Sequence, residues 1–185
     1  MTRLHLSASM VLLLGSLSLL SACGFHLAGT RPLPEPLQRV YINVIAPYQV
    51  VQPPLETALR AILQRRGADV RGETAPGTAV IRLSELEETR EVLSVGIDGK
   101  ALEFRLVTSV QYQVFRDGRM LAGPDSLRLT RDYSFQPEQV LAKEAEEARL
   151  RAFIQTEMAE LMLLRLESQL GKLAAVSTPA PASAP

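Results

Sequence analysis

Few side chains in this sequence could carry out catalysis or hold a metal ion. Cys23 is the single cysteine, and His26 is one of two histidines, the other being His5 near the start. Motifs of common hydrolases, metalloproteases and thiol redox enzymes, namely GxSxG, HExxH and CxxC, do not occur in the sequence. We therefore expect no enzyme activity, no cofactor and no metal site.

Two acidic clusters, Glu85–Glu88 and Glu144–Glu147, could supply paired carboxylates for acid–base chemistry. Such pairs work when their surroundings separate the two pKa values. The first cluster alternates along an expected strand. The second lies near the amino end of an expected helix, where carboxylates interact favourably with the helix dipole. We interpret both clusters as solvated faces.

Basic residues on the expected sheet offer a different chemistry. Guanidinium groups bind phosphate oxygens bidentately, so an anionic lipid head group is a candidate ligand. The residues concerned are Arg82, Arg90, Lys100, Arg105, Arg116, Arg119 and Arg128. The sequence therefore favours a binding protein over an enzyme.

Cys23 follows a segment with the three parts of a secretory signal. Arg3 provides a positive start, and an apolar run from Met10 to Leu20 precedes small residues. The run is shorter than the roughly 20 residues that span a bilayer. The stretch from Leu20 to Cys23 resembles the lipobox of bacterial lipoproteins, in which the cysteine sulfur is acylated and the preceding segment is cleaved. We predict that residues 1–22 are removed and that Cys23 becomes the lipidated amino terminus.

The residue after Cys23 bears on the destination of the protein. Lipoproteins retained at the inner membrane commonly carry Asp at this position, whereas this sequence has Gly24. The resemblance implies the periplasmic side of the outer membrane, held by an acyl anchor of two or more chains. An ordinary secretory signal beside an unrelated cysteine is the alternative, and it would leave a lone thiol in an oxidising compartment.

Composition limits the partners and the domain count. Basic and acidic residues number 20 each, and tryptophan is absent, so we expect no nucleic-acid partner. The proline-containing residues 23–38 are predicted to form a tether, and the Pro/Ala-rich residues 171–185 a disordered tail. Residues 39–170 remain as a single domain.

The pattern of this domain predicts the element order β-α-β-β-β-α. A strand over Arg39–Ile45 precedes a helix that begins at Pro53 and Pro54 and ends at Gly67. Three strands follow, the first over Ala79–Val95 with a bulge near Glu85. They are connected by two-residue turns at Asp98–Gly99 and Asp117–Gly118.

A second helix is predicted from Pro137 to Leu170. At roughly 50 Å it would exceed the sheet it could cover, so the excess contacts a partner or frays. We predict an α+β sandwich, a four-stranded mixed sheet with both helices on its single apolar face. Inward positions of the last two strands include Leu102, Phe104, Tyr112 and Leu127.

Two stretches resemble one family, the lipopolysaccharide-assembly lipoproteins called LptE. They are Cys23–Thr30, which begins Cys-Gly-Phe-His-Leu, and Phe135–Glu144, which leads into the long helix. The resemblance covers Cys23 to about Leu170. It implies a non-enzymatic protein that plugs the large outer-membrane β-barrel LptD, helps that barrel assemble and assists lipopolysaccharide delivery to the outer leaflet.

The resemblance also implies contacts with lipopolysaccharide. Lys143 matches one basic position of the family, near the start of the last helix. Ile97 occupies the other, so Lys100 or Arg90 would have to substitute for it. The alternative function is a stand-alone periplasmic lipoprotein that binds lipopolysaccharide or another lipid, and such a protein would expose an apolar cavity.

Overall fold

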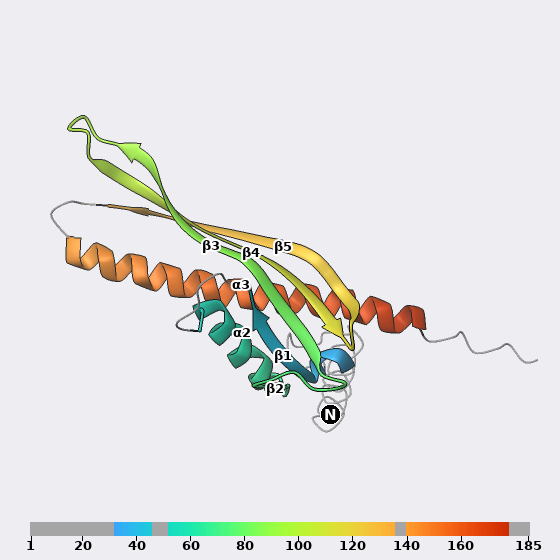
Figure 1. Cartoon of the computed structure of the whole chain (residues 1–185). Coiled ribbons are helices and arrows are strands. Elements are labelled where there is room, and N and C mark those ends of the chain that lie inside the picture. The colour runs from blue at the N-terminus through green and yellow to red at the C-terminus, as the bar shows by residue number, and fades with distance from the viewer. Residues whose placement is uncertain (1–31, 46–51, 136–139, 178–185) are drawn as a thin grey trace, which may run out of the picture. The chain divides into compact units, whose positions relative to one another are not determined.

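The computed structural model describes residues 32–45, 52–135 and 140–177. Except for Pro32, these residues belong to one compact unit, Leu33–Pro185. Its elements in chain order are η1 (Glu35–Leu37), β1 (Arg39–Val44), α2 (Pro54–Arg65), β2 (Asp69–Arg71), β3 (Ala79–Val95), β4 (Ala101–Arg116), β5 (Arg119–Ser134) and α3 (Val140–Ser177). Both α-helices lie on one side of the sheet (Figure 1), which confirms the predicted α+β class.

The sheet has five strands in the order β2-β1-β3-β4-β5, one more than predicted. β1 pairs in parallel with β2 and β3, and the remaining pairs are antiparallel. The additional strand, β2, is only three residues long, too short to show an alternating pattern. A turn after α2 places it, since the Ala68 amide donates to the Leu63 carbonyl and the Asp69 amide to that of Gln38.

The two predicted hairpins form, with different turns. Asp117 and Gly118 both have positive φ, as a two-residue turn between β4 and β5 requires. The prediction of a two-residue turn at Asp98–Gly99 is wrong. There the Gly96 amide donates to the Lys100 carbonyl over 2.8 Å and closes a three-residue loop, in which Gly99 takes the positive φ.

The predicted bulge near Glu85 is confirmed. Glu85 has a φ of 51°, and the register between β3 and β4 shifts between Ser84 and Glu87. One extra residue reverses which side chains face the helices. Leu83 therefore points into the core before the bulge, whereas Glu88 and Arg90 face the helix side after it.

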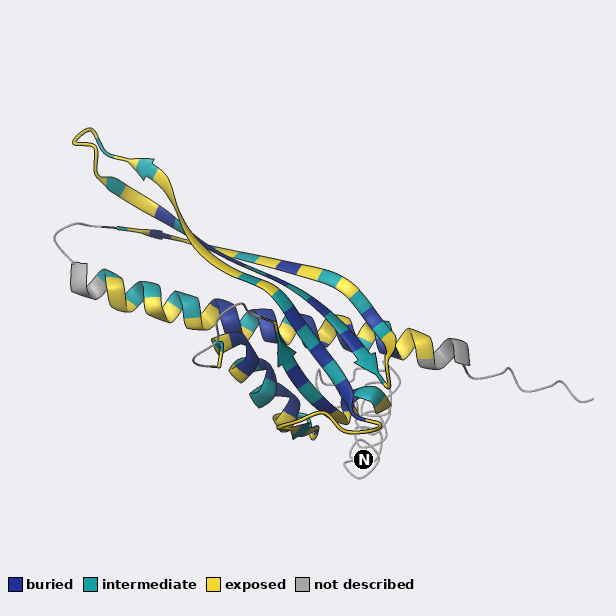
Figure 2. Cartoon of the chain, in the orientation of Figure 1, coloured by how far each residue is buried: buried dark blue, intermediate teal, exposed yellow. Residues whose placement is uncertain are grey.

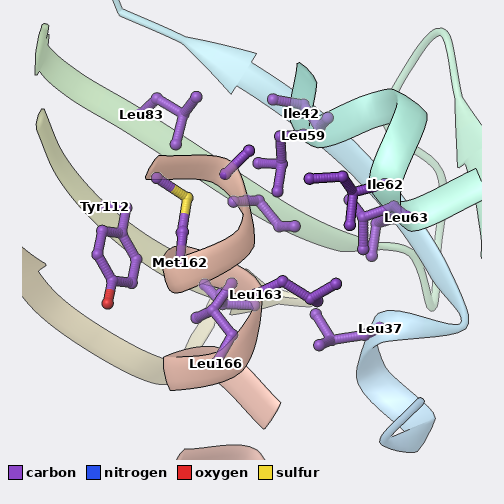
Figure 3. Close-up of a cluster of buried hydrophobic side chains, with 14 of the residues drawn as sticks. Leu37, Ile42, Leu59, Ile62, Leu63, Leu83, Tyr112, Met162, Leu163 and Leu166 are labelled. Carbon is purple, nitrogen blue, oxygen red and sulfur yellow. The ribbon is translucent and has the colours of Figure 1, made fainter. Parts of the chain in front are cut away.

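The main core lies between α2, α3 and the half of the sheet that contains β1. Figure 3 shows Leu59 and Leu63 of α2 meeting Met162 and Leu166 of α3 over the sheet. Tyr112 of β4 is part of the same cluster, and its hydroxyl donates to Asp125 over 2.8 Å. Burial, together with that hydrogen bond, raises the pKa of Tyr112.

β3 continues beyond the end of β1, and the residues from Glu87 to Leu106 form what we call the hairpin arm (Figure 1). A second, smaller core covers its helix side, made of Phe104, Leu106, Tyr133 and Ile154. Toward its tip the exposed colour dominates in Figure 2. Leu102, which was predicted to be buried, is exposed there because it lies beyond this second core.

The domain boundaries differ from the predicted ones at both ends. Leu33 and Leu37 are 5% and 0% exposed and belong to the core, so the tether cannot extend to residue 38. η1 turns them inward, with the Leu37 amide donating to the Pro34 carbonyl over 2.8 Å. At the other end α3 passes Leu170 and continues to Ser177, so residues 171–177 are helical rather than part of a tail.

The remaining predictions at the termini lie outside the described residues. They are the signal segment 1–22, Cys23, residues 24–31, the helix start at Pro137 and residues 178–185. Within the described part of the chain, no helix is both long enough and apolar enough to span a bilayer.

Replacing Leu37 tests whether the segment before β1 is part of the core. Leu37→Ala should lower the free energy of unfolding by about 3 kcal/mol, because it removes a fully buried side chain and leaves a cavity. Leu164→Ala, at an exposed position on α3, should change it by less than about 0.5 kcal/mol. Urea unfolding followed by circular dichroism measures both changes. Equally small effects would mean that Leu37 belongs to the tether, as the sequence predicted.

Candidate functional site

A cluster of charged side chains joins the hairpin arm to the first half of α3, and we call it the Glu147 cluster. Glu147 accepts hydrogen bonds from Arg90 of β3 over 3.0 Å and from the Tyr133 hydroxyl of β5. Arg151, one turn further along α3, donates to it from Nε and Nη2 over 3.0 and 2.7 Å. One carboxylate thus connects three elements of the fold.

Arg151 extends the cluster to a second carboxylate. Its Nη1 donates to Glu88 over 3.2 Å, and Gln155 Nε2 also donates to Glu88. Gln155 is almost fully buried, and its Oε1 atom has no hydrogen-bond partner in the structure. Arg90 is held from its other side by the ring of Phe104, whose centroid lies 4.6 Å from the guanidinium carbon.

The protonation of Glu147 reflects these contacts. Burial alone would raise its pKa, but the hydrogen bonds from Tyr133, Arg151 and Arg90 outweigh burial and lower the pKa to about 2. Glu147 is therefore ionised at any physiological pH. A carboxyl group that stays ionised at physiological pH cannot donate a proton as a general acid. The cluster is therefore suited to holding the arm rather than to catalysis.

Both acidic clusters were predicted to be solvated, and this is wrong for Glu147, whose side chain is 17% exposed, whereas Glu88 is exposed as predicted. Glu88 and Glu147 are bound by Arg151 in the Glu147 cluster. Glu85 and Glu144 are exposed, as predicted, and Glu85 accepts a hydrogen bond from Gln111. The bulge at Glu85 turns Glu88 toward the helix, where Arg151 binds it.

The three residues that the family resemblance suggested for lipopolysaccharide contact have different surroundings. Arg90 is bound to Glu147 and Phe104. Lys143 lies 2.7 Å from Glu146, and only 14% of its side chain is exposed. Lys100, in the loop of the hairpin arm, is 64% exposed and lies 3.3 Å from Asp98. The structure does not bring the three together into one pocket.

Most of the other basic residues of the sheet are also paired. Arg105 makes two hydrogen bonds of 2.8 Å with Asp132, Arg116 lies 2.6 Å from Glu35, and Arg128 lies 3.8 Å from Glu91. Arg82 lies over the ring of Phe115. Arg119 is exposed and has no partner among the described residues.

An exposed aliphatic patch at the tip of the arm was missed by the sequence reasoning. It consists of Val92, Leu93, Val95, Ile97 and Leu102. In the sequence, Leu93, Val95 and Ile97 occupy alternate positions, as the inward residues of a half-buried strand do. Only the position of the tip, beyond the end of the second core, shows that nothing among the described residues covers them.

The described residues contain no group of acidic, histidine or cysteine side chains arranged to hold a metal ion. They form a shallow cavity of about 320 Å³ between the loop that precedes β3 and the turn after β4. Thr78, Val80 and Phe115 line it. It lies on the sheet face away from the helices. Arg116 and Asp117 also line it, and they are bound to Glu35 and to the Gly77 amide.

Removing the charge of Glu147 should separate the arm from α3. Glu147→Gln should destabilise the fold by about 2 kcal/mol at pH 7, since it leaves Arg90 without a carboxylate and Arg151 with Glu88 alone. Glu144→Gln, at an exposed position without an ion pair in the described structure, is the matched control and should be neutral.

The same contact predicts a pH dependence. The folded-state pKa of Glu147 is below its ordinary value of 4.5, so its stabilisation is fully present above that pH and is lost as the pH falls toward 2. The difference in unfolding free energy between the natural protein and Glu147→Gln should therefore shrink over this range. A difference that stays constant down to pH 2 would contradict the assignment.

Comparison with known proteins adds an independent observation. Residues 37–166 match the family described as LptE, lipopolysaccharide-assembly. The LPS-assembly lipoprotein LptE of Photorhabdus laumondii is 34% identical over 163 residues, 87% of this chain and 84% of that protein. That of Pectobacterium atrosepticum is 33% identical over 159 residues, 84% of this chain and 83% of that protein.

Solved structures show the same fold. A lipoprotein B from Nitrosomonas europaea has a TM-score of 0.60 and 25% identity over 78% of this chain and 91% of its own. The rare lipoprotein B from Shewanella oneidensis has a TM-score of 0.59 and 23% identity over 72% of this chain and 98% of its own. The family match, the named relatives and the shared fold agree with one another. The chain belongs to the LptE family of lipopolysaccharide-assembly lipoproteins.

Proposed function

We propose that this protein is an acylated outer-membrane lipoprotein that acts in lipopolysaccharide assembly as the plug of an LptD-like β-barrel. Its relatives are named for lipopolysaccharide assembly, and most of their length aligns with this chain. The role is non-enzymatic. Cys23 carries the acyl anchor in this proposal and holds the protein at the periplasmic side of the membrane.

The outer face of the sheet is the observation that best supports a plug. Side chains alternate along β4, so Arg105 and Ser109 point away from the helices while Leu106 and Val110 point toward them. The outer face also carries Thr89 of β3 and Asp132 of β5. Large barrels have a polar interior, and a polar face of mixed charge suits contact with it.

The covered apolar sheet face disfavours the alternative, a stand-alone lipid-binding lipoprotein, which requires an apolar cavity. The apolar sheet face is covered by α2 and α3, whose side chains fill the space above it (Figure 3). The shallow cavity near Thr78 and Phe115 lies on the other face. The apolar patch at the arm tip is a surface rather than a cavity.

Of the three residues suggested for lipopolysaccharide contact, we assign the main role to Lys100. Its ammonium is exposed and pairs only with an equally exposed Asp98. Arg90 would first have to leave Glu147, and Lys143 would have to leave Glu146. A phosphate group that binds Lys100 therefore has to break only an exposed ion pair.

Affinity purification tests the barrel partner. The tagged protein, extracted from outer membranes in mild detergent, should bring down a large β-barrel that mass spectrometry identifies. A membrane extract in which the folded protein carries no such barrel would contradict the proposal.

The anchor has its own test. Cys23→Ser should release the mature chain from the membrane fraction without changing its melting temperature, because the buried core residues of the described part of the chain lie at or after Leu33. A variant that stays bound to the membrane after separation from the barrel, or that unfolds, would contradict this role of Cys23.

The lipid contact is tested by comparing two arm variants. Lys100→Gln should weaken lipopolysaccharide binding severalfold with no loss of stability, because an exposed ion pair contributes little to folding. Arg90→Gln should instead lower the melting temperature. If Arg90→Gln abolished binding at an unchanged melting temperature while Lys100→Gln bound normally, the assignment would be reversed.

A further inference from the structure

The two ends of the folded unit differ in the charges that remain unpaired. We call the end with η1, the start of β1, the end of α2 and the β4–β5 turn the base. Contacts between elements define it. Arg116 at the end of β4 is bound to Glu35 of η1, and the Gly77 amide donates to Asp117 over 3.0 Å. Arg39 at the start of β1 is in register with Asp69 of β2.

Exposed cations without an ion pair gather at the base. Within the described part of the chain, the structure gives no acidic partner to Arg39, Arg65 or Arg119, and all three are exposed. Arg39 begins β1, Arg65 ends α2 and Arg119 follows the β4–β5 turn. These guanidinium groups are therefore free to bind an external anion.

The acids of the base are largely engaged and do not cancel these cations. Glu35 lies 2.6 Å from Arg116, Asp69 lies 2.7 Å from Arg71, and Glu167 lies 2.8 Å from Arg66. Asp117, which accepts a hydrogen bond from the Gly77 amide, and the exposed Glu73 have no ion pair in the described structure, and they offset only two of the three cations. The uncompensated charge of the base is positive.

The hairpin arm and the first half of α3 show the opposite sign. Glu87 and Glu144 are exposed and have no ion pair in the described structure, and Arg149 is the exposed cation without one at this end. The folded unit therefore has a positive base and a more acidic arm. Such an asymmetry orients a protein beside a charged surface.

The chain enters the folded unit at the base. Leu33 begins this unit, and Leu37 and Arg39 follow in η1 and β1. The residues between Cys23 and Leu33 span at most about 35 Å when fully extended. An acyl anchor at Cys23, which rests on the function proposed above, would keep the base within that reach of lipid head groups.

We propose that the base binds the anionic phospholipid head groups of the leaflet that holds the anchor, through Arg39, Arg65 and Arg119. Guanidinium groups bind phosphate oxygens bidentately, and basic residues close to an anionic membrane each strengthen binding. This contact directs the arm away from the membrane surface that carries the anchor.

Vesicle flotation tests the proposal apart from the anchor. The chain from residue 23 with Cys23→Ser lacks the acyl group, and it retains the core residues that are buried in the described structure. It should float with vesicles of equimolar phosphatidylcholine and phosphatidylglycerol, and not with vesicles of pure phosphatidylcholine. Added salt should reduce the bound fraction, since it screens the attraction.

Arg39→Gln, Arg65→Gln and Arg119→Gln should each lower the vesicle partition about fivefold. Arg149→Gln, an equally exposed cation on α3, is the matched control and should leave it unchanged. Melting temperatures confirm that each variant is folded. Equal flotation with both kinds of vesicle, or a loss with Arg149→Gln as large as with the base variants, would overturn the proposal. Neither result bears on whether a barrel copurifies.

Discussion

The need to cover one apolar sheet face along strands of unequal length determines this structure. β1 has six residues, whereas β3, β4 and β5 have 16 or 17, which is about 50 Å of strand. α2 covers only the part near β1. α3, with 38 residues or about 57 Å, covers the rest and ties the main core to the second core under the arm. It is slightly longer than the strands, and its residues 171–173 are exposed.

The second core is small, so charged contacts add to its apolar packing in holding the arm. Four buried side chains lie between the arm and α3, and the Glu147 cluster joins β3, β5 and α3 beside them. An arm held in this way presents its polar outer face as a fixed surface. That property suits a subunit that fits into a larger partner, and it explains why Arg90 is engaged inside the protein instead of being free for a ligand.

The sequence predicted the parts that local patterns determine. The span of β3, both hairpins, α2 and the bulge at Glu85 follow from alternation, proline and Asp-Gly signals. It could not predict β2, which a tertiary contact places, or the burial of Leu37, whose surroundings come from distant elements. Nor could it assign Glu88 and Arg90 to the helix side, because that depends on the register after the bulge.

The central claim is that the polar outer face of the arm contacts an outer-membrane β-barrel. A photo-reactive amino acid at Thr89, which is exposed on that face, tests it most directly in living cells. Irradiation should give a covalent product with one large β-barrel protein, and none when the same group replaces Leu63 in the main core. A folded, membrane-bound protein that forms no barrel product from Thr89 would contradict it.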